Sequence, residues 1–429
     1  MSDETYSAET GPDVGRQSDR GGAPRTAEGL TDWTIPVISS VRADPEDWAW
    51  AHERRKPADP DITADQVAAI LLVHQAAGWL PRTLNALRRS GERAEVQIAV
   101  DLGSTDGSSE LLLEAVGEGL LEECVTASAD TPPGDGISLA IDRLPDDVTH
   151  IWILHDDVEV RRDSLTCMLR EASRKPHPDV LYPTLLKPAR HNYPEFIDEQ
   201  GQSVSTGGTR VLPVVDRGDI DQKQADPGPI LGGSTAGMFI RLDVWRRLSG
   251  FDPALPLFRD GVDFGWRANE AGLVVRTAPS CTIHHRQAGR GWQRESHIAP
   301  RPDVTDRLAG MRMVAARTGH PTRTSLALLL VSVWRFLVLM VGKAPARAAD
   351  EWRAGWQLWR SRSVAREMSR RLQDFHAQCD PDDLENTNRL IPSRRSVWAR
   401  AVDRYAGDLS DRIHPWRHED GTTIDDLTG

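Results

Sequence analysis

Cysteine is scarce in this 429-residue sequence, and the few that occur are far apart. They are Cys124, Cys167, Cys281 and Cys379. None forms a CxxC pair, which argues against a structural zinc site and against a disulfide framework. The N-terminus also lacks the apolar core of a secretory signal. Both absences favour a reducing cytoplasm as the location of the protein.

Several ligand-binding motifs are missing as well. No GxGxxG follows any predicted strand, which disfavours a dehydrogenase, and the lack of GxxxxGK[ST] disfavours a P-loop NTPase. No helix-turn-helix, zinc-finger or RNA-binding signature is present. Nucleic acid is therefore a weaker candidate than membrane phosphates as an anionic partner.

Charge is distributed unevenly along the chain. The net charge is -12, yet residues 286–376 contain 17 Lys and Arg against 7 Asp and Glu. This stretch thus carries +10 and the rest of the chain about -22. Such asymmetry predicts a basic surface on one part of the protein only.

Composition divides the chain into three parts. Residues 1–64 begin with a polar stretch that we predict to be disordered, followed by a tryptophan-containing arm. Residues 65–295 hold the regular alternation described next and form the predicted central domain. Residues 296–429 form a predicted helical region that associates with membranes.

Short apolar runs alternate with helical patterns in the central domain. Strands are predicted at 67–73, 96–100, 124–128 and 150–157, and helices at 79–89, 108–116, 136–144 and 163–174. Continuous apolar runs are typical of strands buried on both faces. The sequence therefore predicts an α/β fold, a mainly parallel sheet with helices on both faces. Ligands bind such sheets at the carboxyl ends of the strands.

Acidic side chains follow two of these strands. "DLGSTDGSS" (101–109) offers a tight turn and a helix N-terminus that can face an anion. "HDD" (155–157) offers adjacent acids, which suit a hard divalent cation shared with phosphate oxygens. Asp106 as a simple helix cap, and Asp156 and Asp157 as solvated turn acids, remain alternatives.

Four motifs, in order, resemble the family 2 glycosyltransferases, which have the Rossmann-like GT-A fold. They are "VDLGSTDGS" (100–108), "ILHDDVEV" (153–160), "GGSTAGMFIRLDVWRRLSGFD" (232–252), and "FRDGVDFGWR" (258–267) with "IHH" (283–285) after it. The resemblance covers half of the chain. It is nearest to actinobacterial cell-envelope glycosyltransferases of the rhamnosyl and galactofuranosyl type.

The resemblance implies a donor site and a metal site. Asp101 would contact the base or ribose of the nucleotide, Asp106 would belong to the same loop, and Asp156 would lie beside the ribose and diphosphate. Asp157 would hold a divalent metal, Mn²⁺ or Mg²⁺, together with His285. His155 stands where many members have the first acid of their DxD motif, so that carboxylate is missing. A structural role for His284 or His285 under the sheet edge remains open.

The same resemblance raises a question about the catalytic base. It places the base at Gly261, which has no side chain, and leaves Asp260 as the nearest acid. Asp260 either replaces the base, or the protein binds a donor without efficient transfer. In an extended segment Asp260 would point away from the side expected for residue 261. On that assumption Gly261→Asp should raise the transfer rate.

The helical region contains one long apolar segment. Residues 325–342 are strongly apolar but have Arg335 near the centre, which favours a helix lying in the membrane interface over a span or a core helix. Trp352, Trp356 and Trp359 then share one helical face among arginines. Core packing is the alternative for these tryptophans.

We predict an inverting glycosyltransferase that uses a nucleotide diphosphate sugar and a divalent metal. Its acceptor would be a hydroxyl of a lipid-linked or polysaccharide substrate in cell-envelope glycan synthesis, at the cytoplasmic face of the membrane. The alternatives are a catalytically impaired donor-binding scaffold of the same fold and a sugar-1-phosphate nucleotidyltransferase. The latter is disfavoured because residues 74–82 do not form a Gly-rich basic loop.

Overall fold

The computed structural model describes residues 61–189, 193–289, 296 and 298–393. The chain divides into two compact units, Met1–Ala58 and Asp59–Gly429, and all described residues belong to the second. Apart from residues 61–64, the predicted disordered segment and arm lie outside the described residues.

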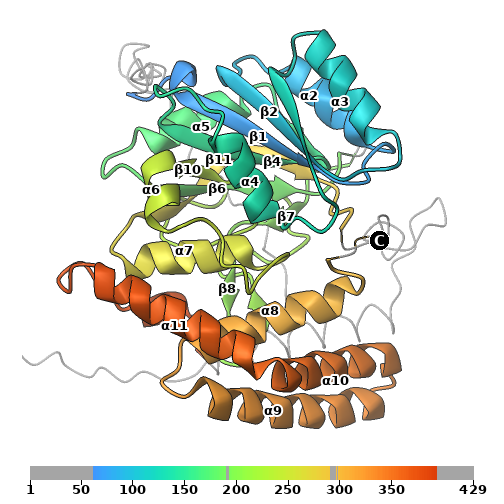
Figure 1. Cartoon of the computed structure of the whole chain (residues 1–429), viewed down its shortest axis with the longest axis vertical. Helices are drawn as coiled ribbons and strands as arrows, with labels where there is room; N and C mark the ends of the chain where they lie inside the picture. The colour runs from blue at the N-terminus through green and yellow to red at the C-terminus, as the bar shows by residue number, and fades with distance from the viewer. Residues whose placement is uncertain (1–60, 190–192, 290–295, 297, 394–429) are drawn as a thin grey trace, which may run out of the picture. The chain divides into compact units, whose positions relative to one another are not determined.

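A nine-stranded sheet forms the centre of the described chain (Figure 1). Its order is β3-β2-β1-β4-β10-β6-β11-β5, and β7 pairs with β6. The strands are β1 Val67–Val73, β2 Val96–Leu102, β3 Glu123–Ala127, β4 His150–His155, β5 Val158–Val160, β6 Val180–Leu186, β7 Ile197–Glu199, β10 Phe239–Arg241 and β11 Val275–His285. The first four strands run parallel, β10 is antiparallel to both of its neighbours, and β11 is parallel to β6.

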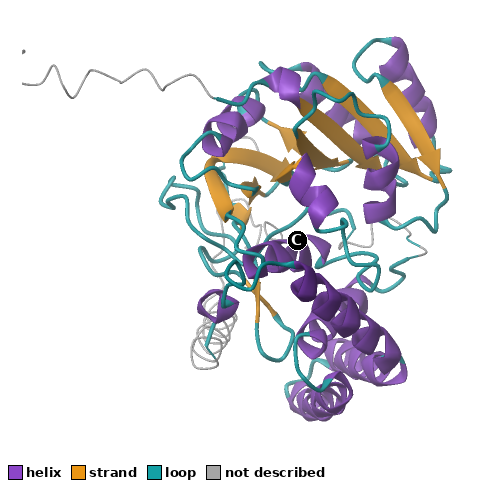
Figure 2. Ribbon diagram, turned by 60° about the vertical axis from the view of Figure 1, so that its left-hand side comes forward, coloured by secondary structure: helices purple, strands orange, loops and turns teal. Residues whose placement is uncertain are grey.

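Both faces of the sheet are buried, because the strands carry apolar side chains on both sides. In β1, Ile70 and Leu72 belong to one core cluster, whereas Leu71 and Val73 belong to the other. This is the period of two expected for a strand. The helices are α2 Leu80–Arg88, α3 Ser108–Gly117 and α5 Ser164–Ala172 on one face, and α4 Pro133–Ile141, α6 Leu242–Arg247 and α7 Asp260–Glu270 on the other (Figures 1 and 2). The predicted α/β fold class is confirmed.

The predicted strands and helices up to residue 174 are present, with ends that differ by a few residues. The largest change concerns the predicted strand at 150–157, since β4 ends at His155. Asp156 and Asp157 form the turn between β4 and β5. This turn places both acids at the carboxyl edge of the sheet.

Helices follow the sheet from residue 302 onward. They are α8 Pro302–Ala316, α9 Pro321–Val341, α10 Pro345–Arg360 and α11 Arg362–Gln378. Helix α8 lies between two apolar clusters. Ala309 and Met313 pack with Val262 and Trp266 of α7, while other α8 residues pack with α9, α10 and α11. Helix α8 therefore joins the helical region to the helix that begins at Asp260.

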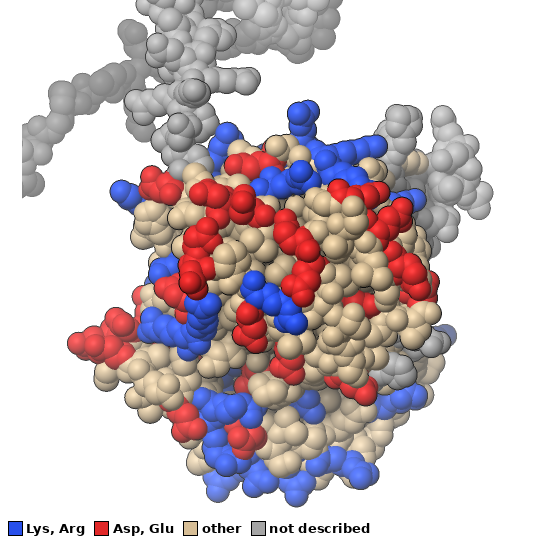
Figure 3. Space-filling model, turned by 45° about the horizontal axis from the view of Figure 1, so that its top comes forward, with Lys and Arg blue, Asp and Glu red and all other residues tan. Residues whose placement is uncertain are grey.

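Helix α9 is long and apolar enough to cross a membrane, and only 17% of its apolar window is buried. Figure 3 shows one face of the molecule, on which acidic and basic side chains are both present, with basic ones along both the upper and the lower margins. Arg335, near the middle of α9, pairs with Glu351 of α10 at 3.3 Å. The one charged group in the apolar stretch is therefore used in packing one helix against another.

Candidate active site

One cavity lies at the carboxyl ends of β1 and β4. Its wall includes Asp156 and Asp157 from the β4–β5 turn, His285 from the end of β11 and Asp260 from the start of α7. The parallel pairing of β1 with β4 brings these ends to the same edge of the sheet. The structure thus gathers four of the six predicted site residues around one space.

The other two, Asp101 and Asp106, are not among the residues that line this cavity. Asp101 is buried at the end of β2 and accepts hydrogen bonds from the Ser104 amide at 2.9 Å and from the Ser109 hydroxyl. These bonds hold the 101–109 turn closed. The carboxylate of Asp101 therefore shapes the loop beside the cavity in this conformation.

Asp106 also organises its own loop. One carboxylate oxygen accepts from the Ala77 amide at 2.9 Å, and the other accepts from the Ser108 hydroxyl at 2.6 Å and the Ser108 amide at 3.2 Å. Burial alone would raise the pKa of Asp106, but these hydrogen bonds lower it. The residue before α3 is Gly107 and no side chain caps the helix, so Asp106 is not the helix cap that the sequence left open.

Asp156 is held firmly at the floor of the cavity. It is 1% exposed, and its carboxylate accepts from the His74 amide at 2.8 Å and from the Trp79 indole at 3.3 Å. Thr83 of α2 donates to its main-chain carbonyl at 2.6 Å. These bonds fix both the backbone and the side chain of the acid next to Asp157.

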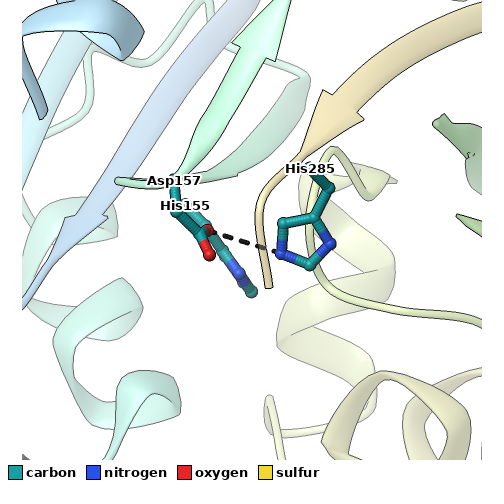
Figure 4. A group of neighbouring side chains, drawn as sticks. All are labelled: His155, Asp157 and His285. Carbon is teal, nitrogen blue, oxygen red and sulfur yellow. Dashed lines mark ion pairs between the residues drawn. The ribbon is translucent and has the colours of Figure 1, made fainter. Parts of the chain in front are cut away.

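Asp157, His285 and His155 form a compact cluster (Figure 4). Each offers one ligand atom, and these atoms all lie within 4.8 Å of one another. The Asp157 carboxylate lies 3.4 Å from Nε2 of His285, and its other oxygen accepts from the Ala288 amide at 2.8 Å. Burial lowers the pKa of His285, but the Asp157 carboxylate outweighs this and raises it.

This cluster fits a divalent cation. Ligand atoms about 2.0–2.2 Å from one ion lie roughly 3–4 Å from each other. The 3.4 Å between Asp157 and His285 falls in this range, and all three ligand atoms lie within 4.8 Å of one another. Nδ1 of His285 is buried and has no hydrogen-bond partner among the described residues. His155 Nε2 lies 2.9 Å from the Thr235 hydroxyl, which orients its ring. Asp157, His285 and His155 are thus the residues that could hold a metal.

His155 was missed as a ligand candidate from the sequence, where it counted only as a lost carboxylate. Its position as the last residue of β4 was the signal that could have found it. Because β5 pairs with β11, His285 is brought back beside the same strand end. The pairing of β5 with β11, which the sequence analysis did not predict, completes the cluster.

Residues 260–267 are helical, so the assumption of an extended segment was wrong. Asp260 is the first residue of α7, and Gly261 is the second. A Cβ on Gly261 would lie 2.6 Å from the carbonyl oxygen of Gly233 and 3.0 Å from Thr235. Tyr182 also donates to the Gly261 carbonyl at 2.7 Å. The glycine is therefore required by the close approach of α7 to the 231–235 segment.

Asp260 is the acid that the helix presents to the cavity. It is 7% exposed, and its carboxylate accepts from the Gly261 amide at 2.9 Å. Burial raises the pKa of Asp260 to about 6, although the hydrogen bond from Gly261 acts in the opposite direction. A carboxyl group with this pKa is ionised at neutral pH and can accept a proton.

Further polar residues of the cavity wall come from short segments after β6. Glu199 accepts from the Ser234 amide at 2.8 Å and from Gln202 at 2.6 Å, and lies 3.5 Å from Arg210. Arg259 lines the same wall. Glu199 and Arg210 could not be found from the sequence, because two- or three-residue strands carry no readable periodicity.

Comparison with known proteins finds relatives in sequence and neighbours in structure. No protein-family model matches the chain. An N-acetylglucosaminyl-diphospho-decaprenol L-rhamnosyltransferase from each of two strains of Mycobacterium tuberculosis is 24% identical over 253 residues. The match covers 55% of this chain and 81% of each relative.

Two solved structures show a weaker likeness. A mannosyltransferase from Pyrobaculum calidifontis in complex with GDP-Man and Mn²⁺ has 15% identity and a TM-score of 0.43, covering 78% of this chain and 94% of that one. S. aureus TarS has 11% identity and a TM-score of 0.38, covering 64% of this chain and 43% of that one. The chain thus spans less than half the length of TarS. At these scores the likeness adds no argument to that from the strand order.

The separate observations agree with one another. The sheet has parallel strands β1 to β4, an antiparallel β10 inserted beside β4, and the acidic motifs at the carboxyl edge. The rhamnosyltransferase relatives match over more than half of the chain. Together, the four motifs, the sheet and these relatives agree with the resemblance to the family 2 glycosyltransferases of the GT-A fold.

Proposed function

We propose that this chain is an inverting glycosyltransferase that moves a sugar from a nucleotide diphosphate to a hydroxyl of a lipid-linked or polysaccharide acceptor. The observation that carries the proposal is a single cavity lined by a metal-type cluster and by a separate buried acid, Asp260. Sugar transfer needs a group that stabilises the leaving nucleotide and a group that removes the proton of the acceptor. The metal-type cluster and Asp260 are these two kinds of group, and both can reach a substrate in the same cavity. The L-rhamnosyltransferase relatives support a lipid-linked acceptor.

Asp260 is the proposed catalytic base. With a pKa of about 6 it is ionised at neutral pH, and it accepts the proton of the attacking hydroxyl. A positioned base typically contributes 10²–10⁴-fold in rate. The packing requirement at Gly261 removes the main evidence for an impaired donor-binding scaffold, because the glycine does not mark a lost base.

Asp157, His285 and His155 are the proposed holders of a divalent metal, Mn²⁺ or Mg²⁺. Such an ion, when bound, stabilises negative charge on a departing nucleotide diphosphate as a Lewis acid. Asp156 is proposed to face the ribose and diphosphate of the donor from the floor of the cavity. Asp101 and Asp106 are proposed to serve the donor by shaping the loop between β2 and α3.

We further propose that residues 65–295 form the catalytic domain and residues 296–429 a helical region that lies on the cytoplasmic surface of an anionic membrane. Support comes from the apolar residues that α9 exposes, among them Leu330, Trp334 and Val341. Trp352 and Trp356 of the neighbouring α10 are also partly exposed and stack at 6.0 Å. Exposed apolar patches of this kind mark interaction surfaces.

A donor screen tests the proposed function. Calorimetry with UDP-, GDP- and dTDP-linked hexoses, with and without Mn²⁺, should identify one nucleotide that binds only with the metal. Product analysis with a polyprenyl-diphosphate sugar acceptor should then show sugar transfer. Binding without transfer would favour the scaffold, and pyrophosphate release from a sugar phosphate and a nucleoside triphosphate would favour the nucleotidyltransferase.

A further inference from the structure

The chain enters α7 through an uncommon backbone conformation. Phe258 and Arg259 both have positive φ, 64° and 61°, immediately before Asp260. Residues with a side chain rarely adopt this left-handed region, and such strain persists only where surrounding contacts hold it. The direction of Asp260 therefore depends on whatever holds Arg259.

Asp306 of α8 is the partner that holds Arg259. The guanidinium is buried, and its Nε and Nη2 donate to the two Asp306 oxygens at 2.8 and 2.9 Å. This two-point contact fixes the orientation of a guanidinium as well as its charge. Asp306 also accepts from Arg210 at 2.5 Å, so one carboxylate joins two arginines of the cavity wall.

Helix α8 is itself fixed against the sheet region. Gly208 and Gly310 pack backbone to backbone, since a Cβ on Gly310 would lie 2.2 Å from the Gly208 carbonyl oxygen. Arg307, the next residue after Asp306, donates to the Gly207 carbonyl at 2.6 Å and also pairs with Glu351 of α10. Asp306 is therefore presented to Arg259 from a rigid element outside the sheet.

We propose that Asp306 is a positioning residue for the base: it holds Arg259 in the left-handed conformation and thereby aims the Asp260 carboxylate into the cavity. This inference rests on the proposed function, in which Asp260 accepts the acceptor proton. It assigns the helical region a direct part in the catalytic site, beyond attachment to a membrane.

The charges around Asp260 supply a readout that a purely structural role would not move. Arg210 of strand β9 (Arg210–Val211) lowers the pKa of Asp260, and Asp263 of α7 raises it. Tyr182 of β6 interacts electrostatically with Asp260, and Glu199 of β7 lines the same cavity. Asp306 compensates the charges of Arg210 and Arg259. Its removal should therefore lower the pKa of Asp260.

The experiment compares Asp306→Asn with Asp252→Asn. Asp252 makes a similar two-point ion pair to Arg371 of α11, at 2.7 and 3.2 Å, but does not contact Arg259. For Asp306→Asn we expect kcat to fall roughly 10–100-fold, because small misplacements of a reacting group have effects of this size. Donor affinity should stay within about twofold, and the acid limb of the kcat profile should move to lower pH. Asp252→Asn should leave kcat and the acid limb as in the wild type.

A second variant covers the case in which Asp306→Asn does not fold. Arg259→Lys keeps the charge but loses the two-point contact. It should lower kcat without moving the acid limb. The inference is overturned if kcat and the acid limb of Asp306→Asn match those of Asp252→Asn, or, where Asp306→Asn does not fold, if Arg259→Lys turns over like the wild type.

Failure of the proposed function can be distinguished from failure of the inference about Asp306. If the wild type transferred no sugar from any donor, amide hydrogen exchange at the start of α7 would still test the positioning contact. Exchange of the Gly261 and Asp263 amides should be faster in Asp306→Asn than in Asp252→Asn. Equal exchange in the two variants would overturn the inference independently of activity.

Discussion

The sheet with the helices on its two faces, here called the sheet region, and helix α9 use their apolar side chains in opposite ways. All seven residues of β1 are buried, and they are apolar. In the 21-residue α9 the buried residues are Ser325, Leu328 and Ser332, whereas Trp334 is 67% and Val341 is 86% exposed. The sheet follows the rule for a protein in water, and α9 turns small polar residues inward and large apolar ones outward.

This contrast explains how α9 packs. A Cβ added to Gly355 of α10 would lie 2.6 Å from the Ser332 side chain, so the two helices approach each other closely through small residues. Ser332 donates to Glu351 at 3.3 Å, and the same carboxylate pairs with Arg335. Close contact through small residues and buried polar pairs is typical of helices in lipid. This packing agrees with the proposal that α9 and α10 meet lipid.

The largest expected effect lies in the sheet region. Asp260→Asn should lower the transfer rate by about 10²–10⁴-fold, because the base is lost. The variant keeps the size of the side chain, so donor affinity should hold in a calorimetric titration. Glu199→Gln, at another buried acid of the wall, is the matched control. A larger loss in Glu199→Gln than in Asp260→Asn would move the base to Glu199.

The raised pKa of Asp260 gives that prediction a pH dependence. The rate should fall as the pH drops through about 6, since the base becomes protonated. The contribution of Asp260 to the stability of the fold depends on pH in the opposite direction. The pKa of Asp260 in the folded protein lies above the ordinary aspartate value of 3.8, so this group stabilises the fold below pH 3.8 and loses that contribution as the pH rises through about 6. Asp260→Asn should therefore melt at a higher temperature than the wild type at pH 7, while catalysis is lost.

The next effect concerns the metal-type cluster. Asp157→Ala should weaken nucleotide diphosphate binding in Mn²⁺ by about 10–100-fold and remove its metal dependence. Asp163→Ala is a suitable control, because this acid precedes α5 and does not line the cavity. Equal affinity of wild type and Asp157→Ala, with and without Mn²⁺, would contradict the metal site.

Gly261 offers a test of the packing between α7 and the 231–235 segment of the cavity wall. Gly261→Ala should destabilise the fold by about 1–3 kcal/mol, as overpacking does, and lower the melting temperature by several degrees. Gly78→Ala should change stability by less than about 0.5 kcal/mol, because no atom lies within 4 Å of its Cβ position. The larger aspartate at 261 should fit even less well, so the rate gain expected from an extended segment is withdrawn. Unchanged melting of Gly261→Ala would show that α7 can move away from Gly233.

The sequence predicted four of the nine strands of the sheet, β1 to β4, because their signals are local. The apolar runs of β1, β2 and β4 and the acids after them could be read without knowledge of the fold. The cavity wall could not be predicted from the sequence, because it depends on contacts between segments that are distant in the chain. Examples are the contact of Arg259 with Asp306 and the pairing of β5 with β11. Gly261 shows the same limit. Its neighbours Gly233 and Thr235 are far away in the sequence, so a packing requirement looked like a missing base.

The smallest expected effect tests the contrast between the buried apolar side chains of the sheet region and the exposed ones of α9. Trp334→Ala should weaken binding to anionic vesicles several-fold and leave the melting temperature nearly unchanged, because the side chain is 67% exposed. Leu113→Ala on α3, 63% exposed on the sheet region, should alter neither quantity. High salt should weaken vesicle binding further, since each basic residue near an anionic surface contributes about 1 kcal/mol. Binding that withstands both salt and alkaline carbonate would identify α9 as a membrane span, and equal vesicle binding by the two variants would mean that the exposed face of α9 does not meet lipid.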